Sequence, residues 1–216
     1  MKALIIGANG LIGSHCLKEL LTDDQYSGIE IWVRRSSGFS HPKLKESIIN
    51  FDQISGIAPT EADHVFCCLG TTINKVKTRE AFSKIDRDYV AELARLAERS
   101  GCEKFMVVSS IGADLKSKNF YLKTKGEMEE AVKNCSIPAI YVFRPSMLLG
   151  KREEFRLGEK IGKAFMVAFN FMFVGKLRKY RGIQASTVAM AMIRIARNNE
   201  KGIFVFESDE IENIMK

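Results

Sequence analysis

Short apolar runs alternate with longer stretches of helical periodicity along the whole chain. Each run has the length of a strand, and those without polar interruption are typical of strands buried on both faces. The runs that predict strands are residues 3–6, 29–33, 47–51, 64–70, 104–110, 139–143 and 203–206. The segments that predict helices are residues 11–21, 79–100, 118–134 and 186–197. This alternation predicts an α/β fold built on one doubly wound parallel sheet with right-handed crossovers.

We expect one domain over residues 1–216, because no Pro-rich linker, repeat or block of charge divides the chain. Only residues 150–182 break the alternation, and we expect them to form a lid or insertion in a small C-terminal substrate region. The longest apolar stretch, residues 161–174, is interrupted by Lys163 and Asn170. It is shorter than the roughly 20 residues that a membrane-spanning helix needs.

The first predicted strand leads directly into the glycine-rich segment GANGLIG, which opens the first predicted helix. Glycines allow a sharp turn and a close approach to phosphates, and the N–H groups and dipole at a helix start favour negative charge. A tight turn that binds nothing is the alternative, but the strand and helix on either side favour a dinucleotide site. The predicted cofactor-binding residues of this segment are Gly7, Asn9, Gly10, Leu11, Ile12 and Gly13.

Two arginines, Arg34 and Arg35, stand at the end of the second predicted strand, where NAD-preferring proteins usually carry an acid. A guanidinium group can bind a ribose 2′-phosphate with two hydrogen bonds, whereas an acid would repel it. The sequence therefore predicts NADP(H) as the cofactor, with NAD(H) as the alternative. Two solvated arginines without a ligand are the other interpretation.

A second group of candidates follows the fifth predicted strand. Ser109 and Ser110 end that strand, and Tyr121 and Lys125 stand four residues apart on the next predicted helix, on one face. A nearby ammonium group stabilises a phenolate, so the Tyr–Lys pair could exchange a proton with a substrate oxygen that a Ser hydroxyl polarises. A chance pair on a solvated basic helix is the alternative. We predict Ser110, Tyr121 and Lys125 as catalytic residues.

Charge and cysteine usage limit the other classes of function. The formal net charge of +7 would suit an anionic partner of any kind. No recognition motif accompanies the basic residues, so we do not expect a nucleic acid partner. Five cysteines without CxxC spacing, and three scattered histidines, support neither a disulfide framework nor a metal site. With no secretory signal, we expect a reducing, cytoplasmic setting.

These motifs together resemble the short-chain dehydrogenase/reductase superfamily, in its atypical, extended-like branch, and most closely the oxidoreductases related to Tat-interacting protein. The resemblance covers nearly the whole chain and implies a Rossmann-like fold. The segments that carry it, beside the arginine pair, are GANGLIG (residues 7–13), FCCLGTT (66–72), DRDYV (86–90), VVSSIGAD (107–114), FYLKTKGEME (120–129) and VFRPSMLLG (142–150).

The resemblance also implies roles for individual residues. Tyr121 would be the proton donor and acceptor, Lys125 would bind the nicotinamide ribose and lower the pKa of that hydroxyl, and Ser110 would aid the carbonyl. The other cofactor-binding residues that it implies are Asp52, Leu69, Gly70, Tyr121, Lys125 and Leu148. Asp52 would lie against the adenine, Leu69 and Gly70 would follow the fourth strand, and Leu148 would lie near the nicotinamide.

The sequence thus predicts an NADP(H)-dependent oxidoreductase that reduces a carbonyl or oxidises an alcohol on a small molecule. A non-catalytic NADPH-binding regulator, which would bind a protein partner, is the alternative, because a fold alone does not establish turnover. Residues 161–181, rich in Phe and Met and then in basic residues, could contact a membrane surface, a protein partner or a second copy. Both a monomer and a homodimer are compatible with the sequence, and the sequence does not identify the substrate.

Overall fold

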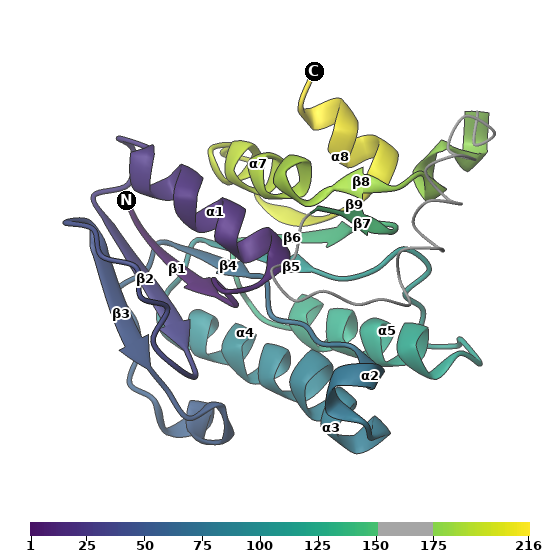
Figure 1. Cartoon of the computed structure of the whole chain (residues 1–216), viewed down its shortest axis with the longest axis horizontal. Helices are drawn as coiled ribbons and strands as arrows, with labels where there is room; N and C mark the ends of the chain where they lie inside the picture. Colours follow the sequence, from purple (N-terminus) through teal and green to yellow (C-terminus); the bar gives the residue numbers. More distant parts are fainter. Residues whose placement is uncertain (151–174) are drawn as a thin grey trace.

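The computed structural model describes residues 1–150 and 175–216. Within these residues the main sheet has seven strands, all of them parallel, in the order β3-β2-β1-β4-β5-β6-β9 (Figure 1). The predicted doubly wound parallel sheet is therefore confirmed. The strands are β1 (Lys2–Ile6), β2 (Gly28–Val33), β3 (Leu44–Ile48), β4 (His64–Cys67), β5 (Lys104–Val108), β6 (Ala139–Arg144) and β9 (Gly202–Glu207).

Helices cover both faces of the sheet, one set on each side (Figure 1). The first face carries α1 (Leu11–Thr22), α7 (Ala185–Ala196) and α8 (Ser208–Ile214). The opposite face carries α2 (Ile73–Val76), α3 (Arg79–Ser83), α4 (Tyr89–Arg99) and α5 (Phe120–Lys133). Each face therefore has its own layer of apolar contacts, as a doubly wound sheet requires.

Strand β1 shows how the apolar runs supply both layers. Ala3 and Ile5 belong to the apolar cluster beneath α1 and α7, whereas Leu4 and Ile6 belong to the cluster beneath α4 and α5. Successive side chains of a strand point to opposite faces, so a run that is apolar throughout is buried on both sides. The uninterrupted apolar run of β1 is thus explained by the position of this strand in the centre of the sheet.

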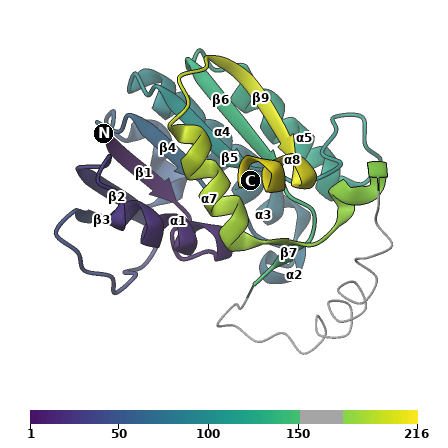
Figure 2. The ribbon, with the colours of Figure 1, turned by 90° about the horizontal axis from the view of Figure 1, so that it is seen from above.

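The strand order reverses between β1 and β4, because the chain first builds outward through β2 and β3 and then continues on the other side of β1. In open parallel sheets, such a reversal leaves a crevice at the carboxyl ends of the strands, and ligands bind there. Figure 2 shows the strands side by side, with α7 lying across one face. The predicted glycine segment, the two arginines and the two serines all follow the carboxyl ends of their strands.

Several predicted elements differ from the observed ones. The fifth strand, expected over residues 104–110, ends at Val108, before the two serines. Residues 47–51 were expected to form a strand, but β3 ends at Ile48, and the Asn50 side chain caps a 3₁₀ helix, η1 (Phe51–Gly56). The fourth strand, expected over residues 64–70, ends at Cys67 because the backbone then turns over the glycine segment. The expected helix over residues 79–100 contains a π-helical turn, η2 (Lys84–Asp88), between α3 and α4.

The predicted lid or insertion at residues 150–182 lies mostly outside the described residues, which resume at Gly175. A 3₁₀ helix, η4 (Gly175–Tyr180), precedes β8 (Ile183–Gln184), which pairs in parallel with β7 (Leu148–Leu149). Arg178 and Lys179 form ion pairs with Glu212 of α8 and Glu207 of β9. These two cations of the predicted basic cluster are therefore partly neutralised within the molecule.

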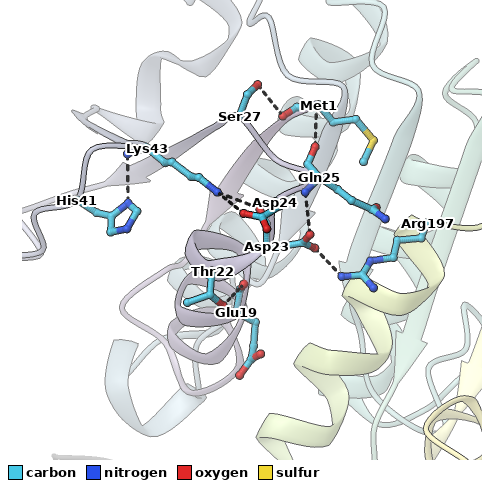
Figure 3. Close-up of polar contacts among 10 residues, drawn as sticks. All are labelled: Met1, Glu19, Thr22, Asp23, Asp24, Gln25, Ser27, His41, Lys43 and Arg197. Atoms are coloured by element: carbon cyan, nitrogen blue, oxygen red, sulfur yellow. Dashed lines mark hydrogen bonds and ion pairs between the residues drawn. The ribbon is translucent and has the colours of Figure 1, made fainter.

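The amino edge of the sheet is tied together by polar contacts, away from the carboxyl ends (Figure 3). Asp23, directly after α1, accepts a hydrogen bond from Arg197, directly after α7, over 2.7 Å. Lys43 donates to the carbonyl oxygen of Asp23, and the terminal ammonium of Met1 donates to the carbonyl oxygen of Gln25. These contacts link α1, α7 and the start of β3, and they leave the carboxyl edge for the candidate site.

Candidate functional site

The glycine segment after β1 is packed so closely that side chains would not fit. Gly7 has a φ of +83°, and a Cβ there would lie 2.7 Å from the carbonyl oxygen of Cys68, which follows β4. A Cβ on Gly13 would lie 2.2 Å from the carbonyl oxygen of Gly7. Both positions therefore require glycine, and together they press the segment against the end of β4 and against the first turn of α1.

The start of α1 offers free backbone donors. Gly10 is the N-cap residue, no side chain caps the helix, and no acid stands in its first turn. The N–H group of Gly10 donates to the carbonyl oxygen of Gly7, which closes the turn at 2.8 Å. The first N–H groups of a helix and its positive dipole end attract phosphate. This arrangement fits the pyrophosphate of a dinucleotide.

The segment after β4 adjoins the glycine turn. The backbone nitrogen of Leu69 lies 3.0 Å from the place that a Gly7 Cβ would take, so the segment of Leu69 and Gly70 lies beside the glycine turn. A Cβ on Gly150, directly after β7, would lie 3.0 Å from the Leu11 side chain. Strand β7, which contains Leu148, therefore ends against the start of α1.

Arg34 and Arg35 are exposed and follow β2 at the carboxyl edge. Among the residues that the structure describes, neither side chain takes part in an ion pair or a side-chain hydrogen bond. Strand β2 is the direct neighbour of β1, so both arginines lie beside the glycine turn. Their guanidinium groups remain available to an anionic ligand, which is the arrangement expected of a 2′-phosphate site.

Asp52, predicted to lie against the adenine, has its carboxylate engaged elsewhere. It forms an ion pair of 2.6 Å with Lys84 and accepts a hydrogen bond from the Tyr89 hydroxyl. The hydrogen bonds from Lys84 and Tyr89 hold the pKa of the exposed Asp52 carboxyl below its usual range. Asp52 lines a surface cavity of about 760 Å³ with Phe120 and residues of η1, α3, η2 and α4.

Tyr121 and Lys125 lie on one face of α5, as their spacing predicts. The Tyr121 ring packs against Phe82, with the ring centroids 5.5 Å apart. Lys125 is 4% exposed, and its Nζ forms an ion pair of 2.7 Å with Oδ1 of Asp86. Burial lowers the pKa of Lys125, but the negative charge of Asp86 raises it, so the pKa lies above its ordinary value.

Gly70 connects this pair to the cofactor crevice. A Cβ on Gly70 would lie 3.4 Å from Oδ1 of Asp86 and 3.9 Å from Nζ of Lys125. The segment after β4 therefore runs from the glycine turn, at Leu69, directly to the buried Lys125 on α5. The structure thus brings together two of the predicted groups, the glycine segment and the Tyr–Lys pair.

The two serines after β5 have different surroundings. The hydroxyl of Ser109, which is buried, donates a hydrogen bond of 2.6 Å to Glu129. The hydroxyl of Ser110 makes only a long contact of 3.4 Å with the carbonyl oxygen of Ile111. Ser109 is thus committed to the interior, and Ser110 is the serine that remains available to a substrate.

Glu129 itself joins three elements. Both of its carboxylate oxygens accept hydrogen bonds from Arg144 of β6, at 2.8 and 2.6 Å, and Lys133 donates to it over 3.1 Å. Burial raises the pKa of Glu129, but the hydrogen bonds from Arg144 and Ser109 lower it below its ordinary value. The network therefore holds the ends of β5 and β6 against α5.

Sequence reasoning did not assign Asp86 or Glu129. Asp86 stands in the segment DRDYV, which was noted only as part of the resemblance, and nothing in its spacing relates it to Lys125. Glu129 follows Tyr121 and Lys125 at the same four-residue interval, so the helical period could have placed it on their face. Of its partners, only Lys133 lies on the same helix, whereas Ser109 follows β5 and Arg144 belongs to β6.

Comparison with families of known proteins agrees with this geometry. The model of a family described as NAD(P)H-binding matches residues 7–166, which is more than half of the chain. The match begins at the first glycine of the turn and includes the arginine pair, both serines and the Tyr–Lys pair. The cofactor class expected from the glycine segment is therefore confirmed at the level of NAD(P)H.

Two relatives illustrate the similarity in sequence. The chain is 37% identical to protein HTATIP2 of Rattus norvegicus over 166 residues, which are 74% of this chain and 68% of that protein. It is 30% identical to the mitochondrial protein FMP52 of Eremothecium gossypii over 228 aligned residues, which cover 100% of this chain and 98% of that protein. The expected resemblance to the group of Tat-interacting proteins is thus confirmed.

Solved structures support the fold. The structure of MoeE5 in complex with UDP-glucose and NAD is similar with a TM-score of 0.70 and 15% identity, over 98% of this chain and 79% of that chain. UDP-glucuronic acid 4-epimerase from Bacillus cereus, in complex with NAD, gives a TM-score of 0.69 and 15% identity, over 97% and 78% of the two chains. At this identity the similarity concerns the fold.

The expected cytoplasmic setting is contradicted by the relatives. Several of the fungal proteins that match this chain are named as mitochondrial. The pattern of cysteines argues only against an oxidising compartment, and it does not separate one reducing compartment from another. Across the two described parts of the chain, no helix has the length and apolar character to cross a membrane.

Proposed function

Because this chain belongs to the NAD(P)H-binding family, we propose that it is an NADP(H)-dependent oxidoreductase that interconverts a carbonyl and an alcohol on a small molecule. The observation that carries the proposal is the position of the Tyr121–Lys125 pair. A Cβ added at Gly70, whose segment adjoins the glycine turn, would lie 3.9 Å from Nζ of Lys125. A proton-transfer pair beside a dinucleotide crevice is the arrangement that carbonyl reduction requires.

The bound nicotinamide supplies the hydride for this chemistry. The glycine segment, with the first N–H groups of α1, would hold the pyrophosphate, while Leu69, Gly70 and Leu148 would border the rest of the cofactor. Tyr121 would give its hydroxyl proton to the substrate oxygen, and the ammonium of Lys125 would stabilise the phenolate that remains. Ser110, whose hydroxyl has no strong partner among the described residues, would donate a hydrogen bond to the same oxygen.

We propose that Arg34 and Arg35 select NADP(H) over NAD(H). Both arginines are exposed at the carboxyl end of β2, and no acid of the described residues pairs with them. Charge-assisted hydrogen bonds from guanidinium to phosphate are strong and directional. Asp52 would contribute little to the adenine, because Lys84 and Tyr89 already occupy its carboxylate.

Replacing Tyr121 by Phe tests the proposed chemistry. The Tyr121→Phe variant keeps the ring that packs on Phe82 and loses only the proton donor. We expect NADPH-dependent reduction across a panel of carbonyl compounds to fall by roughly 100-fold or more. The dissociation constant for NADPH should stay within about twofold, since the hydroxyl makes no large contribution to cofactor binding.

The matched control is Tyr141→Phe, which removes a hydroxyl that donates to the carbonyl oxygen of Glu200, before β9. Its rate should equal that of the unmodified protein. An unchanged rate in Tyr121→Phe would contradict the mechanism. If the unmodified protein binds NADPH but turns over no carbonyl, and its capture of a protein partner depends on NADPH, the non-catalytic regulator is supported instead.

A further inference from the structure

Asp86 is a buried acid in the π-helical turn η2, and its two carboxylate oxygens have different partners. Oδ1 forms the ion pair of 2.7 Å with Lys125 of α5. Oδ2 accepts a hydrogen bond of 2.8 Å from the backbone N–H of Thr71, in the segment after β4. Asp86 is 1% exposed and Lys125 is 4% exposed, so water screens neither group. One carboxylate therefore joins three elements at a single buried point.

Gly70 places the segment after β4 directly beside this ion pair. A Cβ at Gly70 would touch both members of the ion pair, at 3.4 Å from Asp86 and 3.9 Å from Lys125. A carboxylate of this kind can fix both the ammonium of Lys125 and the backbone segment that borders the cofactor crevice. Because the charges are buried, the loss of either partner would leave the other without compensation.

We propose that Asp86 is a positioning residue: it holds the Lys125 ammonium in its charged form beside Tyr121 and fixes the segment after β4 against it. The proposal rests on the proposed function, since it assigns a role within the same site. Asp86 acts through its contacts with Lys125 and the backbone of Thr71.

The charge around Lys125 explains why a carboxylate is needed there. A lysine in the protein interior loses its proton readily unless an opposite charge compensates for burial. The titratable groups that face Lys125 are Asp86 of η2, Tyr121 on its own helix and Cys67 of β4. Burial raises the pKa of the Cys67 thiol to about 12, so this thiol is neutral and provides no charge. Asp86 is the group whose carboxylate pairs with the Lys125 ammonium.

The Asp86→Asn variant tests this role with nearly unchanged shape. The Asn side-chain oxygen can still accept the Thr71 hydrogen bond, and only the negative charge is lost. We expect the pKa of Lys125 to fall by about one unit or more, because burial then acts without compensation. The direct measurement is a pH titration of the intact protein labelled with ¹³C-lysine, following the Cε signal of Lys125 by NMR. A Lys125→Met variant identifies that signal.

The matched control is Asp88→Asn. Asp88 lies two residues further along the same turn, is exposed and pairs with Arg87 at 2.7 Å. Its replacement should leave the titration of Lys125 unchanged. In the kinetic arm, the basic limb of the pH profile of kcat/KM for carbonyl reduction should move to lower pH in Asp86→Asn and stay in place in Asp88→Asn.

Equal titration of Lys125 in Asp86→Asn and in the unmodified protein would overturn the proposal. If Asp86→Asn does not fold, the unmodified protein still decides the matter: a Lys125 that loses its proton below about pH 9 would show that Asp86 does not hold the charge. The NMR titration needs no turnover. Failure of the proposed function, seen as no reduction of any carbonyl, is therefore distinguishable from failure of the role of Asp86.

Discussion

At the scale of single residues, the structure separates side chains that the sequence could not. Ser109 and Ser110 are neighbours of the same type, yet Ser109 is hydrogen-bonded to Glu129, and Ser110 has no strong partner within residues 1–150 and 175–216. Asp52 looked available for a ligand, but Lys84 and Tyr89 engage it. These differences depend on partners that are distant in the sequence, and such partners leave no local pattern in it.

His64 is the residue for which burial has the clearest consequence for pH dependence. It is fully buried at the start of β4, where its Nδ1 lies 2.8 Å from the Tyr26 hydroxyl, and its Nε2 has no partner among the described residues. Burial, together with the positive charge of Lys104, lowers the pKa of His64 to about 4. The unfolded chain should titrate near 6.5.

The unfolded state therefore binds more protons than the folded state between pH 6.5 and pH 4, so stability falls as the pH falls through this window. We expect His64 to contribute a loss of about 2 kcal/mol between pH 7.5 and pH 5. When the free energy of unfolding is measured in urea at both pH values, its decrease in His64→Gln should be smaller than in the unmodified protein by this amount. The control is the His15→Gln variant, which removes a histidine that is only partly buried. Identical losses in His64→Gln and the unmodified protein would contradict this prediction.

At the scale of elements, α5 organises the site with one face. Tyr121, Lys125 and Glu129 recur every four residues, and the last two bind Asp86 and Arg144 from other elements. Periodicity alone placed the Tyr–Lys pair on this helix. The π-helical turn that presents Asp86 interrupts what the sequence predicts as one regular helix, and apolar periodicity does not reveal such an interruption.

Removing the charge of Glu129 should loosen this arrangement. Glu129→Gln leaves Arg144 and Lys133 without their shared acid in a buried network. We expect the free energy of unfolding in urea at pH 7 to fall by about 3 kcal/mol, as for other buried ion pairs that lose one partner. Glu130→Gln, at the exposed next position, should change it by less than about 0.5 kcal/mol. Equal stability of the two variants would contradict a structural role for the network.

At the scale of the whole molecule, the alternation of strands and helices was sufficient to predict the fold. Continuous apolar runs predicted the buried strands, and the glycine segment predicted the turn from the central strand β1 into α1. The predicted end of the third strand was wrong because the Asn50 side chain caps a 3₁₀ helix that begins at the apolar residue Phe51. The prediction of a cytoplasmic setting was wrong as well, because the cysteine pattern indicates only a reducing environment, which several compartments share.

The central claim is that the carboxyl edge of this sheet binds NADP(H) through the glycine turn and the two arginines. The measurement that tests it most directly is a titration of the purified protein with NADPH and with NADH, following nicotinamide fluorescence.

A control in which Arg95 and Arg99 of α4 are replaced by Ala removes the same net charge far from β2 in the sequence. We expect NADPH to bind at least about tenfold more tightly than NADH in the unmodified protein and in this control. The Arg34→Ala/Arg35→Ala variant should lose that preference and still bind NADH. If neither nucleotide binds to the unmodified protein, or if the preference survives without the two arginines, the claim is contradicted.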